Sequence, residues 1–366
     1  MKKILLRLDL NVPIDYQNNK ILETERIDAV IPEIKKLSKK NKIIILSHLG
    51  KGEKNETLKP VENYLRKKLD KKENENIEIL ENVRWQKGET AKLNSKEFIE
   101  TSKYFSDMGD EYIDDAFASM HRAHASIVGI PKIFKKQGKK IRLGDLAKKE
   151  INAINKTIKL SKNSKNNTLV IISGIKISTK LPLIKKLLKN GNKIFVGGGI
   201  ANQIIKDVIN KEIGISIIEE NFKLSESEKR DLLKNIKNKK ILLPVDAILA
   251  DNNIKDINLL NKKDKISDIG PATFSILKKE IENSKNIIMN GPLGNYEQGF
   301  SFGTIATLKE IKKNKNNILI GGGDTLIFTK KLKIKSENNI FVSTAGGAML
   351  DFLSNEGKLP GIEALK

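Results

Sequence analysis

The chain has 366 residues, a formal net charge of +23 at pH 7, 39% hydrophobic residues and no cysteine. The length suggests about two domains, and the lack of cysteine excludes disulfides, thiolate metal sites and cysteine nucleophiles. No run reaches the roughly 18 apolar residues of a membrane span, and the apolar run after Met1 stops at Arg7, too early for a signal peptide. We expect a cytoplasmic protein without a membrane partner.

The positive charge is spread along the chain. Lys accounts for 61 of the 68 basic residues, in short runs typical of solvated helix faces. We interpret the excess as surface charge and expect no specific nucleic-acid partner, although such a field attracts phosphorylated metabolites. Because Arg is rare, its positions are informative. Motif-like segments of the N-terminal third hold, or lie beside, four of the seven Arg and all three His: Arg7, Arg26, Arg84, Arg122, His48, His121 and His124.

Apolar runs that indicate strands alternate with helical patterns almost from end to end. Strands are expected at residues 3–10, 42–49, 77–80 and 112–117, then at 168–173, 193–196, 240–246, 286–290, 317–320 and 339–343. Helices are expected at 25–40, 146–160, 180–189 and 304–313. Continuous apolar strands joined by helix-length connections are typical of parallel sheets covered on both faces. The sequence therefore predicts an α/β fold with two doubly wound, Rossmann-like parallel-sheet domains.

The stretch 132–167 is the least strand-like part of the chain and is rich in Lys and Asn. We place the connection between the domains there. The prediction is an N-terminal domain at 1–145, a hinge helix at 146–160 and a C-terminal domain at 161–345.

Polar side chains follow the predicted strands of the first half, where open parallel sheets bind ligands. Asp9 and Asn11 follow the first strand, and His48 ends the second. With the nearby arginines and Lys51 they suit a small anionic substrate that carries phosphate and carboxylate. Each of these residues taken alone is more often part of a surface ion pair.

The second half has glycine-rich strand ends at 197–199 and 321–323, each followed by a helix. Glycine lets a backbone approach a phosphate, and a helix N-terminus adds oriented N–H groups. Asp324 could bind Mg²⁺ carried by a nucleotide or cap its helix. Neither a P-loop nor a Gly-x-Gly-x-x-Gly pattern occurs. A basic site on one domain and a glycine-lined site on the other together predict phosphoryl transfer.

The chain resembles the phosphoglycerate kinase family over nearly its full length, and the matching motifs occur in the same order. Examples are Ser47-His48-Leu49-Gly50 and Gly321-Gly322-Gly323-Asp324. The segments that carry the resemblance are 7–13, the helix start at Arg26, 47–50, 80–84, 115–117, 121–126, 174–180, 197–199, 243–246, 268–271, 290–294, 321–325 and 343–348.

The resemblance implies a monomeric glycolytic enzyme that transfers a phosphoryl group reversibly between 1,3-bisphosphoglycerate with ADP and 3-phosphoglycerate with ATP. It implies that the N-terminal domain binds 3-phosphoglycerate, that the C-terminal domain binds ATP or ADP with Mg²⁺, and that 346–366 completes the N-terminal domain. The implied catalytic residues are Arg26, Lys176 and Lys180. The implied substrate contacts are Asp9, Asn11, Arg26, His48, Lys51, Arg84 and Arg122. The implied nucleotide contacts are Lys180, Gly198, Gly199, Gly270, Asn290, Pro292, Glu297, Gly322, Gly323, Asp324 and Thr325, with Asp324 linked to the metal.

Some positions depart from the family pattern without removing a predicted charged group. Lys51 stands where the family usually has Arg, and Asp114 where Asn is common; the others are Ser173, Ile175, Asn295, Tyr296 and Ala345. An alternative is a relative that binds nucleotide or nucleic acid without catalysis. A coupled assay with 3-phosphoglycerate and Mg-ATP separates the two hypotheses.

Overall fold

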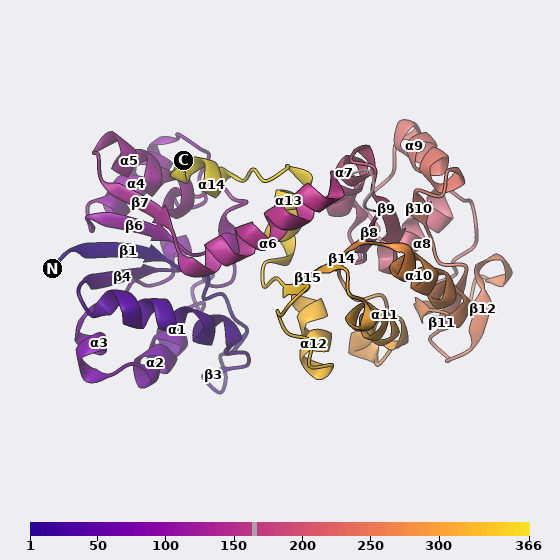
Figure 1. The fold of residues 1–366 in the computed structure, drawn as a ribbon, viewed down its shortest axis with the longest axis horizontal. Helices are drawn as coiled ribbons and strands as arrows, with labels where there is room; N and C mark the ends of the chain where they lie inside the picture. The colour runs from indigo at the N-terminus through magenta and orange to yellow at the C-terminus, as the bar shows by residue number, and fades with distance from the viewer. Residues whose placement is uncertain (163–166) are drawn as a thin grey trace. The chain divides into compact units, whose positions relative to one another are not determined.

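The chain forms two compact units in a computed structural model that describes residues 1–162 and 167–366. The first unit comprises Met1–Asn152 and Asn355–Lys366, and the second comprises Ala153–Ser354 (Figure 1). Residues 163–166, part of the predicted connecting stretch, lie outside the described residues. Within the described residues, no helix is both long and apolar enough to cross a lipid bilayer.

The first unit is built on a parallel sheet with the strand order β5-β4-β1-β6-β7. Its strands are β1 (Lys3–Arg7), β4 (Lys42–Leu46), β5 (Ile77–Ile79), β6 (Glu111–Asp114) and β7 (Lys140–Leu143). Successive side chains enter cores on opposite faces, as the two-residue period of a strand requires: Ile4 and Leu6 pack on one face and Leu5 on the other.

Helices cover both faces of this sheet (Figure 1). One core takes residues from α1 (Glu25–Ser38) and α2 (Lys59–Lys68), and the other from α4 (Lys96–Ser106) and α5 (Ile130–Lys136). The remaining elements of this unit are β2 (Ile14–Asp15), β3 (Lys20–Ile21), α3 (Lys71–Glu75), η1 (Val83–Trp85), η2 (Phe117–Ser119), the π-helical turn η3 (Ala125–Gly129) and α14 (Pro360–Leu365). Helix α6 (Asp145–Ser161) begins in this unit and ends in the second.

The second unit contains a parallel sheet with the order β10-β9-β8-β14-β15-β16 and a small antiparallel sheet with the order β12-β11-β13. The strands are β8 (Thr168–Ile172), β9 (Lys193–Val196), β10 (Ile241–Leu242), β11 (Asp246–Leu249), β12 (Ile254–Asp256), β13 (Ile266–Ile269), β14 (Asn286–Asn290), β15 (Asn317–Gly321) and β16 (Ile340–Val342). The helices are α7 (Ile177–Lys189), α8 (Gly198–Asp207), α9 (Glu226–Lys237), α10 (Pro271–Asn283), α11 (Phe302–Lys313), α12 (Gly323–Lys331) and α13 (Gly346–Ser354), with the short turns η4 (Ile257–Leu259) and η5 (Tyr296–Gln298).

The predicted α/β fold with two doubly wound parallel sheets is confirmed, with two differences in detail. Strand β7 lies inside 132–167, where no strand was predicted. The single strand predicted at 240–246 is wrong, because β10 and β11 belong to different sheets. Pro244 lies between them, and a proline has no N–H to donate to a strand ladder.

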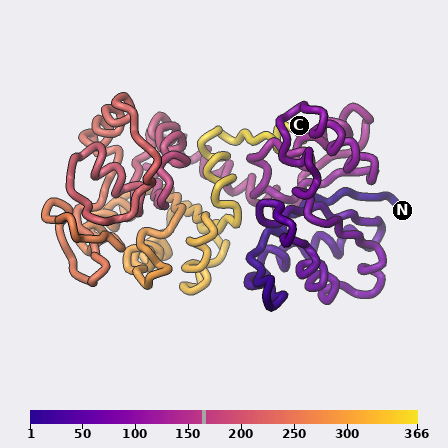
Figure 2. Tube along the Cα trace, turned by 180° about the vertical axis from the view of Figure 1, so that it is seen from behind, coloured from indigo at the N-terminus to yellow at the C-terminus, as the bar shows by residue number. Residues whose placement is uncertain are grey.

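The end of the chain is shared between the two units. Helix α13 packs against α7 of the second unit, although the resemblance assigned 346–366 to the first. The yellow trace in Figure 2 then returns to the first unit, where α14 contacts η3. The Gly361 N–H donates to the Met120 carbonyl there at 2.9 Å.

Candidate active site

The carboxyl ends of three strands meet at one edge of the first sheet. Arg7, the last residue of β1, is paired in register with Leu46 of β4 and with Asp114 of β6. Asp9 and His48 come two residues after β1 and β4. Parallel strands therefore bring to one edge side chains that are far apart in the sequence.

Arg26, the second residue of α1, lies beside the loop that follows β1. One of its nitrogens, Nη1, donates to Asp9 Oδ2 and to the Asn11 carbonyl, each at 3.0 Å. Asn11 Oδ1 in turn accepts from the Gly50 N–H at 2.9 Å. The predicted substrate residues Asp9, Asn11 and Arg26 are thus brought together, whereas Lys51 is exposed on the loop after Gly50.

Three guanidinium groups form the second part of this site, from Arg7 on β1, Arg84 on η1 and Arg122 after η2. Burial lowers the pKa of Arg84, and the charges of Arg122 and Arg7 lower it further. Burial and the same three charges hold the pKa of His48 far below its ordinary value. The site therefore has a concentrated positive potential without a charged imidazole at His48, which suits a multiply charged anion.

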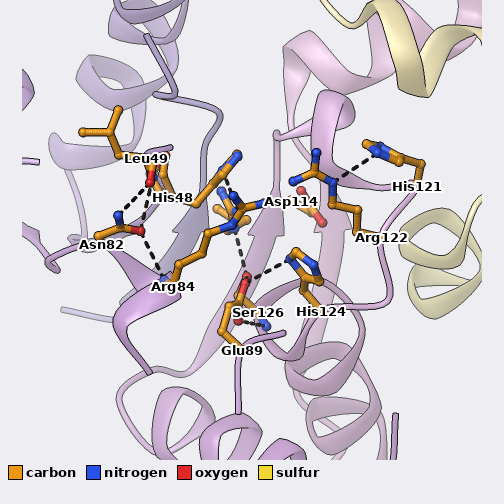
Figure 3. Close-up of polar contacts among 12 residues, drawn as sticks. His48, Leu49, Asn82, Arg84, Glu89, Asp114, His121, Arg122, His124 and Ser126 are labelled. Atoms are coloured by element: carbon orange, nitrogen blue, oxygen red, sulfur yellow. Dashed lines mark hydrogen bonds and ion pairs between the residues drawn. The ribbon is translucent and has the colours of Figure 1, made fainter. Parts of the chain in front are cut away.

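Asn82 fixes the loop that carries His48 (Figure 3). Its Oδ1 accepts from the N–H groups of Leu49 and Arg84 at 3.2 and 3.1 Å, and its Nδ2 donates to the Leu49 carbonyl at 2.8 Å. Arg84 also donates to the Gly50 carbonyl. These contacts hold the segments that carry the predicted substrate residues His48 and Arg84 next to each other. Arg122 donates to the neighbouring His121 Nε2 at 3.1 Å.

Below the arginines lies a buried acidic layer that sequence reasoning missed. Glu89 is fully buried and accepts from the Ser126 N–H and hydroxyl at 2.8 and 2.7 Å. Its Oε1 lies 3.7 Å from His124 Nδ1. Burial raises the pKa of Glu89 to about 6. Its partner is 37 residues away in the sequence, so no local pattern could indicate this role.

Asp114, where the family commonly has Asn, meets Tyr112 in the same layer. The Tyr112 hydroxyl lies 2.7 Å from the Ser126 carbonyl and 3.2 Å from Asp114 Oδ2. One phenolic proton serves the nearer acceptor, so a proton on Asp114 would supply the second bond. Burial raises the pKa of Asp114 to about 6, so this carboxyl keeps its proton to a higher pH than an exposed aspartate does.

Replacing Asp114 by Asn is expected to stabilise the first unit at neutral pH. A carboxyl with a raised folded-state pKa contributes stability below its unfolded pKa and loses that contribution as pH rises to about 6. The amide avoids that loss and can donate to Tyr112. We expect the Asp114→Asn variant to exceed the wild type in unfolding free energy by about 1 kcal/mol or more at about pH 7, with the gap closing near pH 4.

The chain offers a direct probe for this measurement. Trp85 is the single tryptophan and lies in the first unit, so its fluorescence during denaturant unfolding reports that unit alone. A gap that stays the same between about pH 4 and pH 7 would show that Asp114 does not titrate in this range.

The second unit contains a cavity of about 870 Å³ at the ends of β8, β9 and β13. Its lining includes seven of the residues predicted to bind nucleotide or to act in transfer: Lys176, Lys180, Gly198, Gly199, Pro292, Glu297 and Asp324. Lys180 Nζ donates to Asn290 Oδ1 at 3.3 Å. A cavity of this size is in the range that holds a nucleotide-sized ligand.

Glycine is required where two of the turns around this cavity meet. Gly198 has φ +62°, and a Cβ on it would lie 2.7 Å from Ser173 Oγ and 3.0 Å from the Gly174 carbonyl. The turn before α8 can therefore pack against the turn before α7 only with glycine at this position. The first N–H groups of α8 follow directly, which is the arrangement that binds phosphate.

The other predicted nucleotide residues are not among those that line the cavity: Gly270, Asn290, Gly322, Gly323 and Thr325. Thr325 Oγ1 accepts from the Gly291 N–H at 2.9 Å, which holds the loop after β14. A Cβ on Gly270 would lie 2.3 Å from the Asp246 carboxyl group, which caps α10. Their direct contact with nucleotide stays a prediction.

One wall of this cavity is apolar, and the sequence analysis did not predict it. Ile215, Ile217, Ile218 and Ile266 line the cavity, although only Ile266 belongs to a strand, in the antiparallel sheet that was not predicted. Ile175, which replaces a smaller residue of the family pattern, also lines the cavity and is half exposed. An isoleucine in a loop carries no signal in a single sequence that distinguishes a ligand contact from a core position.

The residues present fit a metal ion that arrives with its nucleotide. Asp324 lies at the start of α12 and lines the cavity. Among the described residues, no group of three or more His, Cys, Asp or Glu side chains could hold a metal ion by itself. Mg²⁺ is typically bound by one or two carboxylates together with substrate phosphates, so a single carboxylate suits this mode.

Comparison with known proteins assigns the chain to a family. The family model described as phosphoglycerate kinase matches residues 1–358. The chain belongs to the phosphoglycerate kinase family. The phosphoglycerate kinase of Buchnera aphidicola subsp. Schizaphis graminum is 36% identical over 393 residues, which cover all of this chain and 95% of the relative. That of Coxiella burnetii is 34% identical, with the same coverage.

Solved structures of phosphoglycerate kinases have the same fold. The structure from Coxiella burnetii superposes with a TM-score of 0.79 at 33% identity and covers 100% of this chain and 96% of that one. The structure from Pyrococcus horikoshii gives 0.76 at 26% identity, with the same coverage. Like its family, the chain is a phosphotransferase that works between 1,3-bisphosphoglycerate with ADP and 3-phosphoglycerate with ATP.

Proposed function

We propose that the first unit binds 3-phosphoglycerate at the site formed by Asp9, Asn11, Arg26, His48, Lys51, Arg84 and Arg122. The observation that carries this proposal is the concentration of guanidinium charge at the carboxyl edge of the first sheet, above the buried acidic layer of Glu89 and Asp114. Planar guanidinium groups match the oxygens of carboxylate and phosphate. The substrate of the family carries both of these groups.

The second unit binds ATP or ADP in its cavity. The glycine turn at Gly198 and Gly199 suits close approach of a phosphate, and Lys176 and Lys180 line the same cavity. Asp324 would hold the Mg²⁺, which when bound neutralises charge on the nucleotide phosphates. The apolar wall of isoleucines suits the base, and Glu297 the ribose.

Transfer of a phosphoryl group needs alignment and charge neutralisation more than covalent chemistry from the protein. In this proposal Arg26 on the acceptor side and Lys176 and Lys180 on the nucleotide side balance the charge of the migrating group. The two ligands must be in line at the moment of reaction, and a closing movement of the units would supply this and exclude water. We propose that the enzyme is cytoplasmic and acts as a monomer. Light scattering of the purified chain tests the monomeric state.

The deciding experiment is turnover of 3-phosphoglycerate and Mg-ATP, coupled to reduction of the 1,3-bisphosphoglycerate formed. We expect activity that requires Mg²⁺ and both substrates. Binding of both ligands without turnover would instead indicate a non-catalytic relative. Any affinity for RNA should fall steeply with salt, since diffuse lysine charge acts through counterion release.

A further inference from the structure

The hydrogen bond between Arg7 and His48 determines which imidazole nitrogen carries the proton. Arg7 Nη2 lies 3.3 Å from His48 Nδ1, and both side chains are buried. A guanidinium group has N–H donors and no acceptor. His48 Nδ1 must therefore accept, and the proton of a neutral ring lies on Nε2.

Arg7 is itself held by hydrogen bonds through its other nitrogens. Its Nε donates to Ser126 Oγ at 3.0 Å, and its Nη1 donates to the Leu8 carbonyl. Ser126 donates its hydroxyl and its backbone N–H to the two carboxylate oxygens of Glu89. A chain of hydrogen bonds thus runs from Glu89 through Ser126 and Arg7 to His48, and all four residues are buried.

We propose that Arg7 is a positioning residue that holds His48 as the neutral tautomer with its proton on Nε2, so that this N–H is offered to the anionic acceptor substrate. Glu89 and Ser126 fix the orientation of Arg7. The part that concerns the substrate rests on the proposed function. The tautomer itself rests only on the geometry of the first unit.

The charges around His48 favour the same state. It faces Arg7 from β1, Arg84 from η1, and Arg122 and His124 from the segment between η2 and η3, and each of these lowers its pKa. The neighbouring carboxyl groups of Glu89 and Asp114 interact with Arg7. Protonation of His48 would add a further positive charge to this group, so the ring stays neutral across the physiological range.

The test is nitrogen-15 NMR of the full chain labelled at histidine. With three histidines in the sequence, a His48→Gln sample identifies the signals of His48. We expect an unprotonated Nδ1 and a protonated Nε2 throughout about pH 5.5 to 8, and a shift of the Nε2 signals when 3-phosphoglycerate is added. A ring that titrates in this range, or a proton found on Nδ1, would overturn the proposal.

Variants add a readout that a merely structural role would not change. In Arg7→Met and in the milder Glu89→Gln, we expect the His48 signals to show mixed tautomers. The KM for 3-phosphoglycerate should then rise, while the KM for Mg-ATP stays unchanged. Arg142→Met is the matched control, because Arg142 forms ion pairs with Glu111 and Glu33 in the same unit. The His48 signals of this variant should match those of the wild type.

The outcomes separate this inference from the proposed function. Absence of turnover together with the expected tautomer would refute the function and leave the positioning role of Arg7 intact. Normal turnover with the opposite tautomer would support the function and refute the positioning role of Arg7. A His48 spectrum that does not move while 3-phosphoglycerate binds would show that Nε2 is not offered to the substrate.

Discussion

Replacing Arg26 by Ala should lower turnover by at least about a hundredfold while the fold stays intact. The guanidinium group lies at the start of α1, and its Nη1 donates to Asp9 and to the Asn11 carbonyl. In the proposed mechanism it balances charge that develops on the migrating phosphoryl group, and a well-placed donor in such a site contributes roughly 3 kcal/mol. The loss should appear mainly in kcat, since the interaction is strongest in the transition state.

The measurement is steady-state kinetics with both substrates varied, and the fold is checked by Trp85 fluorescence. The Arg26→Lys variant keeps the charge but loses the fork, so we expect an intermediate loss. Arg66→Ala is the control: Arg66 forms a partly exposed pair with Glu62 on α2, and its removal should leave turnover near the wild-type value. Near-normal turnover of Arg26→Ala would refute the catalytic role of Arg26.

Replacing Lys180 by Met should weaken Mg-ADP and Mg-ATP binding at least tenfold, about 1.4 kcal/mol or more. The ammonium group lines the cavity and donates to the neutral oxygen of Asn290. Burial lowers the pKa of Lys180, and the charge of Asp351 opposes this only in part. An ammonium in such a setting gains a strong partner when a phosphate arrives, because the pair is screened less than at the surface.

Calorimetric titration with Mg-ADP measures this without turnover. Lys189→Met is the matched control, because Lys189 lies on the same helix but is exposed and outside the described lining of the cavity. The KM for 3-phosphoglycerate should stay the same in both variants. An unchanged affinity for Mg-ADP in Lys180→Met would exclude a direct phosphate contact.

The parallel sheets could be predicted because each central strand is a continuous apolar run, such as β4 or β8, between segments of helical period. The rule that ligands bind at the carboxyl ends of such strands then grouped Asp9, Asn11 and His48 correctly at one edge. The antiparallel sheet could not be predicted in this way. Its strands are three or four residues long, too short to display a period.

The contacts within the first substrate site could not be predicted from the sequence either. The sequence indicates that arginines gather near the first substrate site, but it does not show that Arg7 is buried or that Ser126, 119 residues away, accepts from it. Such partners are set by tertiary packing. The same holds for the isoleucine wall of the cavity, whose residues come from loops and from β13.

The path of the chain has a consequence for biosynthesis. All of Ala153–Ser354 is contiguous, whereas the first unit needs Asn355–Lys366 as well. Those last residues place α14 against η3, the turn that holds Ser126, and a Cβ on Gly361 would already crowd Ile127 and Met120. On the ribosome, the second unit can therefore finish folding once Ser354 has emerged, while the first unit still waits for Asn355–Lys366, so loss of these residues would disrupt the first unit before the second.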